Sequence, residues 1–223
     1  MLVLFDLDGT LLDDRAAVAA GVQALHATFS ADRAYQEFVT AWQEALKRRF
    51  EEFDAGHIDF YEQRRARVRD VIDPTLGDEA ADEAFSVYLE AHESAWALYD
   101  DVIPCLDALK GHILGIVSNG IGSQQRAKLT HTAILDRFEL VVVSADVGIR
   151  KPDPAIFRLA CRDRGTNPSD AMHVGDRYQA DALGARSAGL AGVWLDRDES
   201  RDPSHEGPVV STLTELVDMI CPA

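Results

Sequence analysis

The stretch LVLFDLDGTLLDD, residues 2–14, decides the fold. Its first residues, 2–6, are mostly apolar and predict a buried strand. The strand ends in two acidic residues, Asp6 and Asp8, followed by a turn at Gly9 and Thr10. Residues that come directly after buried parallel strands lie at the carboxyl edge of the sheet, where ligands bind in open α/β proteins. Two carboxylates placed two positions apart therefore mark this edge as a candidate functional site.

Residues 15–98 carry helical patterns and nothing that resembles a strand. We expect four helices here, at about 15–29, 33–53, 58–72 and 79–98. In the second helix, apolar residues recur at spacings of three and four and predict a core-facing stripe of Phe38, Trp42, Leu46, Phe50 and Phe53. This block follows the first strand, so we interpret it as a four-helix domain inserted into another fold.

After Pro104, short apolar runs alternate with helical segments. Strands are expected at 113–117, 140–145, 171–174 and 192–195, and helices at about 104–110, 122–133, 154–164, 179–188 and 212–220. This alternation predicts an α/β core, a Rossmann-like parallel sheet in three layers with helices on both faces. The expected core comprises residues 1–14 and 99–223, and residues 15–98 form the inserted domain. Residues 197–208 are expected to be a mobile polar loop.

Composition excludes several classes of function. The 223 residues carry a formal net charge of −16, which disfavours nucleic-acid polymers and anionic membranes as partners. No apolar run approaches the roughly 20 residues that span a bilayer. The chain enters its first strand without a basic leader, which favours a cytoplasmic location. The three cysteines, Cys105, Cys161 and Cys221, are far apart and indicate neither a disulfide framework nor a zinc site.

Four of the five predicted strands deliver a chemically useful group to the same edge of the sheet. These groups are Asp6 and Asp8, then Ser118-Asn119-Gly120, then Lys151, then Gly175-Asp176 with Asp181 five residues later. Singly, such residues are common turn formers and helix caps. Their joint occurrence at one edge indicates a site for chemistry.

In this order the four segments resemble the motifs of the haloacid dehalogenase-like hydrolase superfamily, in its phosphatase branch with an inserted helical cap. The resemblance implies that Asp6 attacks phosphorus to form an aspartyl phosphate, and that Asp8 protonates the leaving oxygen and then activates water. It also implies that Ser118 binds the phosphoryl oxygens and that Lys151 stabilises the developing charge.

The same resemblance implies a Mg²⁺ ion, which suits an all-oxygen site. Its ligands would be Asp6, the carbonyl of Asp8 and Asp176, with Asp181 as a supporting acid. Substrate-binding roles fall to Thr10, which orients the loop, and to Asn119 and Gly120, whose backbone N–H groups would reach the phosphoryl oxygens.

Asp8 also favours one branch of the superfamily. Dehalogenases lack this second acid because a halide leaves without a proton, so a dehalogenase is disfavoured, as is a phosphonatase. We expect hydrolysis of a small phosphorylated metabolite, for example a nucleoside monophosphate or a sugar phosphate. A sugar phosphomutase and a catalytically silent binding module stay open as alternatives, and the sequence leaves monomer or homodimer undetermined.

The inserted domain also carries two basic stretches that could be taken for an anion site. We expect them to form a solvated helix face instead; they comprise Lys47, Arg48 and Arg49 in one helix and Arg64, Arg65, Arg67 and Arg69 in the next.

Overall fold

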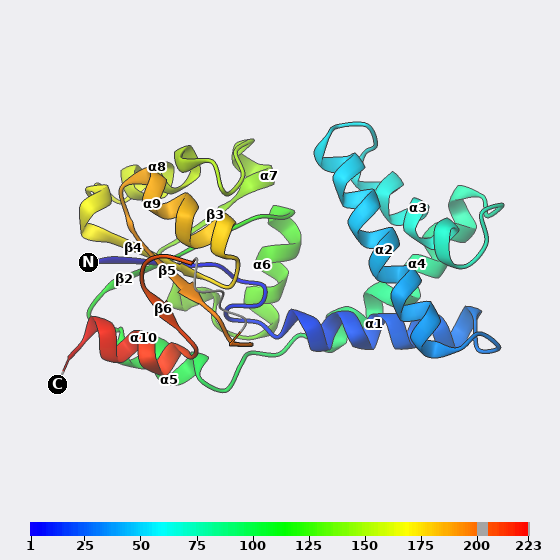
Figure 1. Ribbon diagram of the computed structural model, residues 1–223, viewed down its shortest axis with the longest axis horizontal. Coiled ribbons are helices and arrows are strands. Elements are labelled where there is room, and N and C mark those ends of the chain that lie inside the picture. The colour runs from blue at the N-terminus through cyan, green and yellow to red at the C-terminus, as the bar shows by residue number, and fades with distance from the viewer. Residues whose placement is uncertain (200–204, 223) are drawn as a thin grey trace. The chain divides into compact units, whose positions relative to one another are not determined.

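The computed structural model describes residues 1–199 and 205–222, which form two compact units (Figure 1). Residues Met1–Asp14 and Ala97–Ala223 form one unit, here called the core unit. Residues Arg15–Trp96 form the other, here called the helical unit. The chain thus leaves the core unit after its first strand and returns to it more than eighty residues later.

The core unit is built on a six-stranded parallel sheet with the order β3-β2-β1-β4-β5-β6. Its strands are β1 (Leu2–Phe5), β2 (Ile113–Ser118), β3 (Leu140–Val143), β4 (Ala171–Gly175), β5 (Ala191–Leu195) and β6 (Val209–Val210). Every residue of β1 is buried, as expected for a strand with neighbours on both sides and helices on both faces. The order reverses direction beside β1, which is the switch point where such sheets bind ligands.

Helices cover both faces of this sheet, so the predicted Rossmann-like α/β class is confirmed. In Figure 1, α8 (Pro154–Asp163) and α9 (Gly184–Ala188) lie on one face, and α5 (Val102–Ala108) and α10 (Leu213–Ile220) on the other. The remaining helices of this unit are α6 (Gly122–His131) and α7 (Ser144–Val147), with short turns at Leu135–Arg137 and Pro168–Asp170. In the part of the chain that the structure describes, no helix is both long and apolar enough to cross a bilayer.

Local chemistry fixes several of these boundaries. Helix α8 begins where the Asp153 carboxylate accepts from the backbone N–H of Ala155, with Pro154 in the first turn. Helix α10 begins where the Thr212 hydroxyl accepts from the N–H of Glu215. Such caps satisfy N–H groups that have no partner inside the helix.

Three details of the core unit differ from the sequence prediction. The strand expected to reach residue 145 ends at Val143, because Ser144 already begins α7. The helix expected at 179–188 starts as a π-helical segment, η3 (Tyr178–Leu183), before α9. The polar loop expected at 197–208 lies partly outside the described residues, at 200–204, and is followed by β6, which is too short for a periodicity signal.

The helical unit contains α1 (Asp14–Phe29), α2 (Tyr35–Asp54), α3 (Phe60–Val71) and α4 (Asp78–Ser94). Trp42 of α2 lies at its centre, with no exposed surface. Phe38, Phe85 and Tyr88 belong to the same apolar cluster, and the Trp42 and Tyr88 rings are 4.8 Å apart. This packing explains why a chain segment without strands forms a compact unit of its own.

Two predictions about the helical unit are wrong in part. Phe50, placed in the core-facing stripe, is 38% exposed, because α2 extends past the cluster that buries Phe38 and Trp42. Arg67, expected on a solvated face, is only 5% exposed, and its guanidinium lies 5.1 Å from the Trp42 ring and 5.0 Å from the Phe85 ring. Cation–π contact with these rings compensates its burial.

The other basic residues of these helices follow the expectation more closely. Arg65 pairs with Asp82 and Asp78, and Arg49 pairs with Asp70. Such paired surface charges contribute little to stability and do not by themselves form a binding site.

Candidate active site

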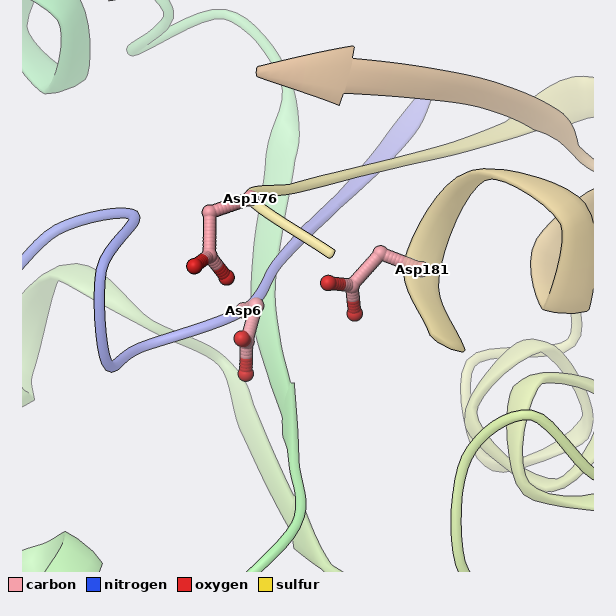
Figure 2. Close-up of side chains that lie close together, drawn as sticks. All are labelled: Asp6, Asp176 and Asp181. Atoms are coloured by element: carbon pink, nitrogen blue, oxygen red, sulfur yellow. The ribbon is translucent and has the colours of Figure 1, made fainter. Parts of the chain in front are cut away.

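Three carboxylates from two strand ends and one helix meet at the switch point of the sheet. Asp6 follows β1, Asp176 follows β4, and Asp181 lies in η3; Figure 2 shows them facing a common space. One oxygen atom from each lies within 4.8 Å of the others. The N–H of Asp6 donates to the carbonyl of Val174 at 2.9 Å, so the hydrogen bonding of the sheet itself brings these strand ends together.

Lys151 neutralises part of this acidic cluster. Its ammonium lies 2.7 Å from Oδ1 of Asp6 and 2.7 Å from Oδ1 of Asp181, and the side chain is almost fully buried. Burial acts against its charge, but the two carboxylates outweigh burial and raise the pKa of Lys151. Lys151 is therefore a fixed positive charge beside Asp6.

Burial raises the pKa of Asp6 to about 6, although Lys151 acts in the opposite direction. Near neutral pH the Asp6 carboxylate is thus ionised, poorly hydrated and within contact of a cation. Loss of water from a carboxylate increases its reactivity as a nucleophile.

Both carboxylate oxygens of Asp181 contact hydrogen-bonding groups of the protein. Its Oδ1 contacts Lys151 and lies 3.1 Å from Nε2 of His173, and its Oδ2 accepts from the N–H of Arg177 at 2.9 Å. Burial opposes ionisation, but Lys151 and His173 prevail and hold the pKa of Asp181 well below its usual range. Such a carboxylate orients Lys151 and His173; its role as a supporting acid stays a prediction.

Asp176 is in the opposite situation. Its Oδ1 is buried and accepts no hydrogen bond from the described residues. Burial, together with the negative charges of Asp6 and Asp181, raises the pKa of Asp176 to about 7. A buried carboxylate oxygen without a donor, next to the oxygen of Asp6, fits a bound cation, and the all-oxygen donor set fits Mg²⁺.

Two glycines make room for these carboxylates. Gly9 has φ +76°, and a Cβ there would lie 2.5 Å from Oδ2 of Asp176. A Cβ at Gly175 would lie 2.3 Å from Cγ of Asp181. A side chain at either position would displace an acidic group of the site.

Three residues predicted to bind substrate make contacts within the protein. The hydroxyl of Thr10 accepts from the N–H of Asp176 at 3.0 Å, which connects the loop after β1 to the loop after β4. The Asn119 amide exchanges two hydrogen bonds with the backbone of Lys151, at 2.9 and 3.0 Å. The Gly120 N–H donates to the hydroxyl of Ser144 at 3.1 Å. In the structure, these groups orient the site; a direct contact with substrate stays a prediction.

Asp8 points to a different set of partners from Asp6. Its Oδ1 lies 2.5 Å from Nζ of Lys128, and its Oδ2 accepts from the Gln125 amide at 2.8 Å. The same Gln125 nitrogen donates to the hydroxyl of Ser118, also at 2.8 Å. The sequence assigned no role at the site to Gln125 or Lys128, although their spacing of three on one helix could have suggested a shared face.

Comparisons with known proteins identify the family of this chain. The family model described as haloacid dehalogenase-like hydrolase matches residues 1–189. A glyceraldehyde 3-phosphate phosphatase from Methanopyrus kandleri is 31% identical over 98% of this chain and 96% of its own.

Solved structures give the same fold. HAD-hydrolase YfnB from Bacillus subtilis, bound to magnesium, has a TM-score of 0.81 at 22% identity over 100% of this chain and 98% of its own. A 2-haloacid dehalogenase from Pseudomonas syringae pv. Tomato DC3000 has a TM-score of 0.73 at 26% identity over 98% of this chain and 97% of its own.

The chain belongs to the haloacid dehalogenase-like hydrolase family, which confirms the predicted family and the prediction of a hydrolytic enzyme.

Proposed function

We propose that the protein is a Mg²⁺-dependent phosphatase that hydrolyses a small phosphate monoester through an aspartyl phosphate on Asp6. The observation that carries the proposal is the buried Asp6 carboxylate, held 2.7 Å from the Lys151 ammonium, with a second acid, Asp8, two residues later. A nucleophile, a fixed cation and a separate proton carrier are what transfer of a phosphoryl group to a carboxylate requires.

In the first step, an oxygen of Asp6 forms a bond to phosphorus while the bond to the leaving oxygen breaks, and Asp8 gives that oxygen a proton. In the second step, Asp8 takes a proton from water, whose oxygen attacks the phosphorus and releases phosphate and Asp6. Ser118 donates a hydrogen bond to a phosphoryl oxygen, and Lys151 offsets the negative charge throughout. We propose Asp6, Asp176 and the carbonyl of Asp8 as ligands of Mg²⁺, which would supply further positive charge at the transferring group.

Asp8 favours a phosphatase over a dehalogenase, although a dehalogenase shares the fold. A halide leaves as a stable anion, whereas an alkoxide leaves poorly without a proton. The similarity to a glyceraldehyde 3-phosphate phosphatase supports a small sugar phosphate as the substrate class, and nucleoside monophosphates stay a second class to test. A cytoplasmic location stays a prediction from the sequence.

Hydrolysis of p-nitrophenyl phosphate tests the proposal. We expect turnover with Mg²⁺, loss of turnover in EDTA, recovery on adding Mg²⁺, and no turnover by Asp6→Asn. Asp136→Asn, an exposed acid of the core unit, is the matched control and should retain full activity. Activity that survives Asp6→Asn would refute the aspartyl phosphate.

A panel of sugar phosphates and nucleoside monophosphates, assayed for both phosphate release and isomer formation, tests the alternatives. Isomer formation with little phosphate release would show a phosphomutase. A wild-type protein that turns over nothing on this panel would favour a silent binding module.

A further inference from the structure

Gln125 and Lys128 lie on the same face of α6, three residues apart, and both are nearly fully buried. Buried polar side chains on a helix are held in one conformation far more firmly than side chains on a surface loop. Both contact Asp8, and Gln125 also contacts Ser118. We propose that Gln125 and Lys128 are positioning residues for phosphoryl transfer, which hold Asp8 at the leaving oxygen and aim the Ser118 hydroxyl at the phosphoryl group.

The first argument concerns charge. Figure 2 shows the carboxylates of Asp6, Asp176 and Asp181. Among the described residues, Lys151 is the only lysine or arginine whose charged group contacts them, and it pairs with Asp6 and Asp181. Asp8 is a fourth carboxyl group at the same sheet edge, and its ionised form, which takes a proton from water in the second step, needs a cation nearby. Lys128 supplies it at 2.5 Å, through a side chain that is only 5% exposed. The site thus uses one lysine for the nucleophile and another for the proton carrier.

The second argument concerns the two hydrogens of the Gln125 amide. One is donated to Oδ2 of Asp8 and the other to Oγ of Ser118, each at 2.8 Å. A carboxylate accepts only from a donor, so the Gln125 nitrogen, and not its oxygen, must face Asp8. Ser118 therefore receives a hydrogen bond from Gln125, and its own hydrogen is directed elsewhere.

Among the residues that the structure describes, the hydrogen of Ser118 has only a long contact, 3.3 Å to the carbonyl of Asn119. A phosphoryl oxygen would be a much stronger acceptor, because hydrogen bonds to ionised groups are shorter and about twice as strong. Gln125 thus leaves Ser118 ready to donate while it fixes Asp8. A single side chain couples the group that binds the phosphoryl oxygens to the group that moves the proton.

This inference rests on the proposed function and predicts a specific kinetic signature. If Lys128 acts through Asp8, replacing Lys128 lowers kcat/KM most for the substrates whose leaving oxygen most needs a proton. Aryl phosphates with increasingly basic leaving groups, from 2,4-dinitrophenyl to phenyl phosphate, measure this need. The value of kcat/KM is the right quantity, because it reports the steps up to release of the leaving group.

We expect Lys128→Met to lower kcat/KM for phenyl phosphate on the order of 10²-fold, and for 2,4-dinitrophenyl phosphate by less than about tenfold. Lys128→Arg should restore most of the loss, since it keeps the charge. Gln125→Leu should also lower kcat/KM more for phenyl phosphate. The matched controls are Lys110→Met, an exposed lysine paired with Asp107, and Gln124→Leu, the half-buried neighbour of Gln125 on α6. Both should retain wild-type values across the series.

A loss of kcat/KM that is equal across the series for Lys128→Met and Gln125→Leu would overturn the inference while the proposed function stands. If the wild type hydrolyses neither the aryl phosphates nor the sugar phosphates and nucleoside monophosphates of the panel, the proposed function is refuted and the inference falls with it. Thermal unfolding monitored by circular dichroism checks that each variant folds. Lys128→Gln replaces Lys128→Met in the same test if the methionine variant does not fold.

Discussion

Replacing Asp176 by Asn should stabilise the metal-free protein at alkaline pH. Burial and the neighbouring carboxylates raise the pKa of Asp176 from 3.8 to about 7. The folded protein therefore keeps a proton that the unfolded chain releases, so stability falls as the pH rises through this interval. At 1.36 kcal/mol for each pKa unit, ionised Asp176 destabilises the metal-free fold by roughly 4 kcal/mol above pH 7. Asn does not ionise and lacks this cost.

The assay is urea unfolding in EDTA at pH 4, 6 and 8. At pH 8 we expect the free energy of unfolding of Asp176→Asn to exceed that of the wild type by roughly 2 to 4 kcal/mol. The gain is smaller than the full cost of the ionised carboxylate because the new amide also needs hydrogen-bond partners. This difference corresponds to about 5 to 15 °C in Tm for a chain of this size. At pH 4 the difference should nearly vanish, because Asp176 is then protonated in the folded wild type.

Adding Mg²⁺ should make the wild type more stable than Asp176→Asn. A ligand that binds only the folded state stabilises it by mass action, so Mg²⁺ should raise the Tm of the wild type and leave that of Asp176→Asn almost unchanged. Asp136→Asn, on the surface of the core unit, controls for the loss of one carboxylate. An Asp176→Asn variant less stable than the wild type in EDTA at pH 8 would refute the reasoning.

Three further substitutions probe the rest of the molecule. Lys151→Met leaves Asp6 and Asp181 without their shared cation, so we expect urea unfolding at pH 8 to show a loss of about 3 to 5 kcal/mol and turnover of p-nitrophenyl phosphate to disappear. Gly175→Ala places a Cβ 2.3 Å from Cγ of Asp181, and should lower both Tm and turnover, whereas retained wild-type turnover would contradict the close packing. Trp42→Ala empties the centre of the helical unit, where Trp42 has no exposed surface, and should cost about 3 to 5 kcal/mol of unfolding free energy.

The fold was predictable because its signals are local and repeated. Alternating apolar runs and helical segments define a parallel α/β core, and four of its strands deliver a polar residue to one edge. Asp6, Ser118, Lys151 and Asp176 could be placed together for this reason alone. Strand β6 has two residues, too few for any periodicity, and it was missed.

Partners inside the site were much harder to predict. Lys128 comes 120 residues after Asp8 in the chain, and only the folded sheet brings α6 next to the loop that follows β1. His173 reads as an ordinary member of a buried strand, and its contact with Asp181 depends on the π-helical turn that points that carboxylate inward. Arg67 was predicted to be solvated and is buried instead. A charged residue among other charged residues in the sequence gives no sign that aromatic rings surround it in the fold.

The position of β1 in the sheet has a consequence for the order in which the chain folds during synthesis. Its partners begin at Ile113 and Ala171, so Leu2–Phe5 leave the ribosome long before either neighbour exists. At typical rates of 5 to 20 residues per second, the wait for β2 is about 5 to 20 s. The helices of residues 15–96 rely on nearby contacts and form within this interval. This fully buried strand is therefore made well before both of the strands that pair with it, which makes it a segment for which a chaperone would have use.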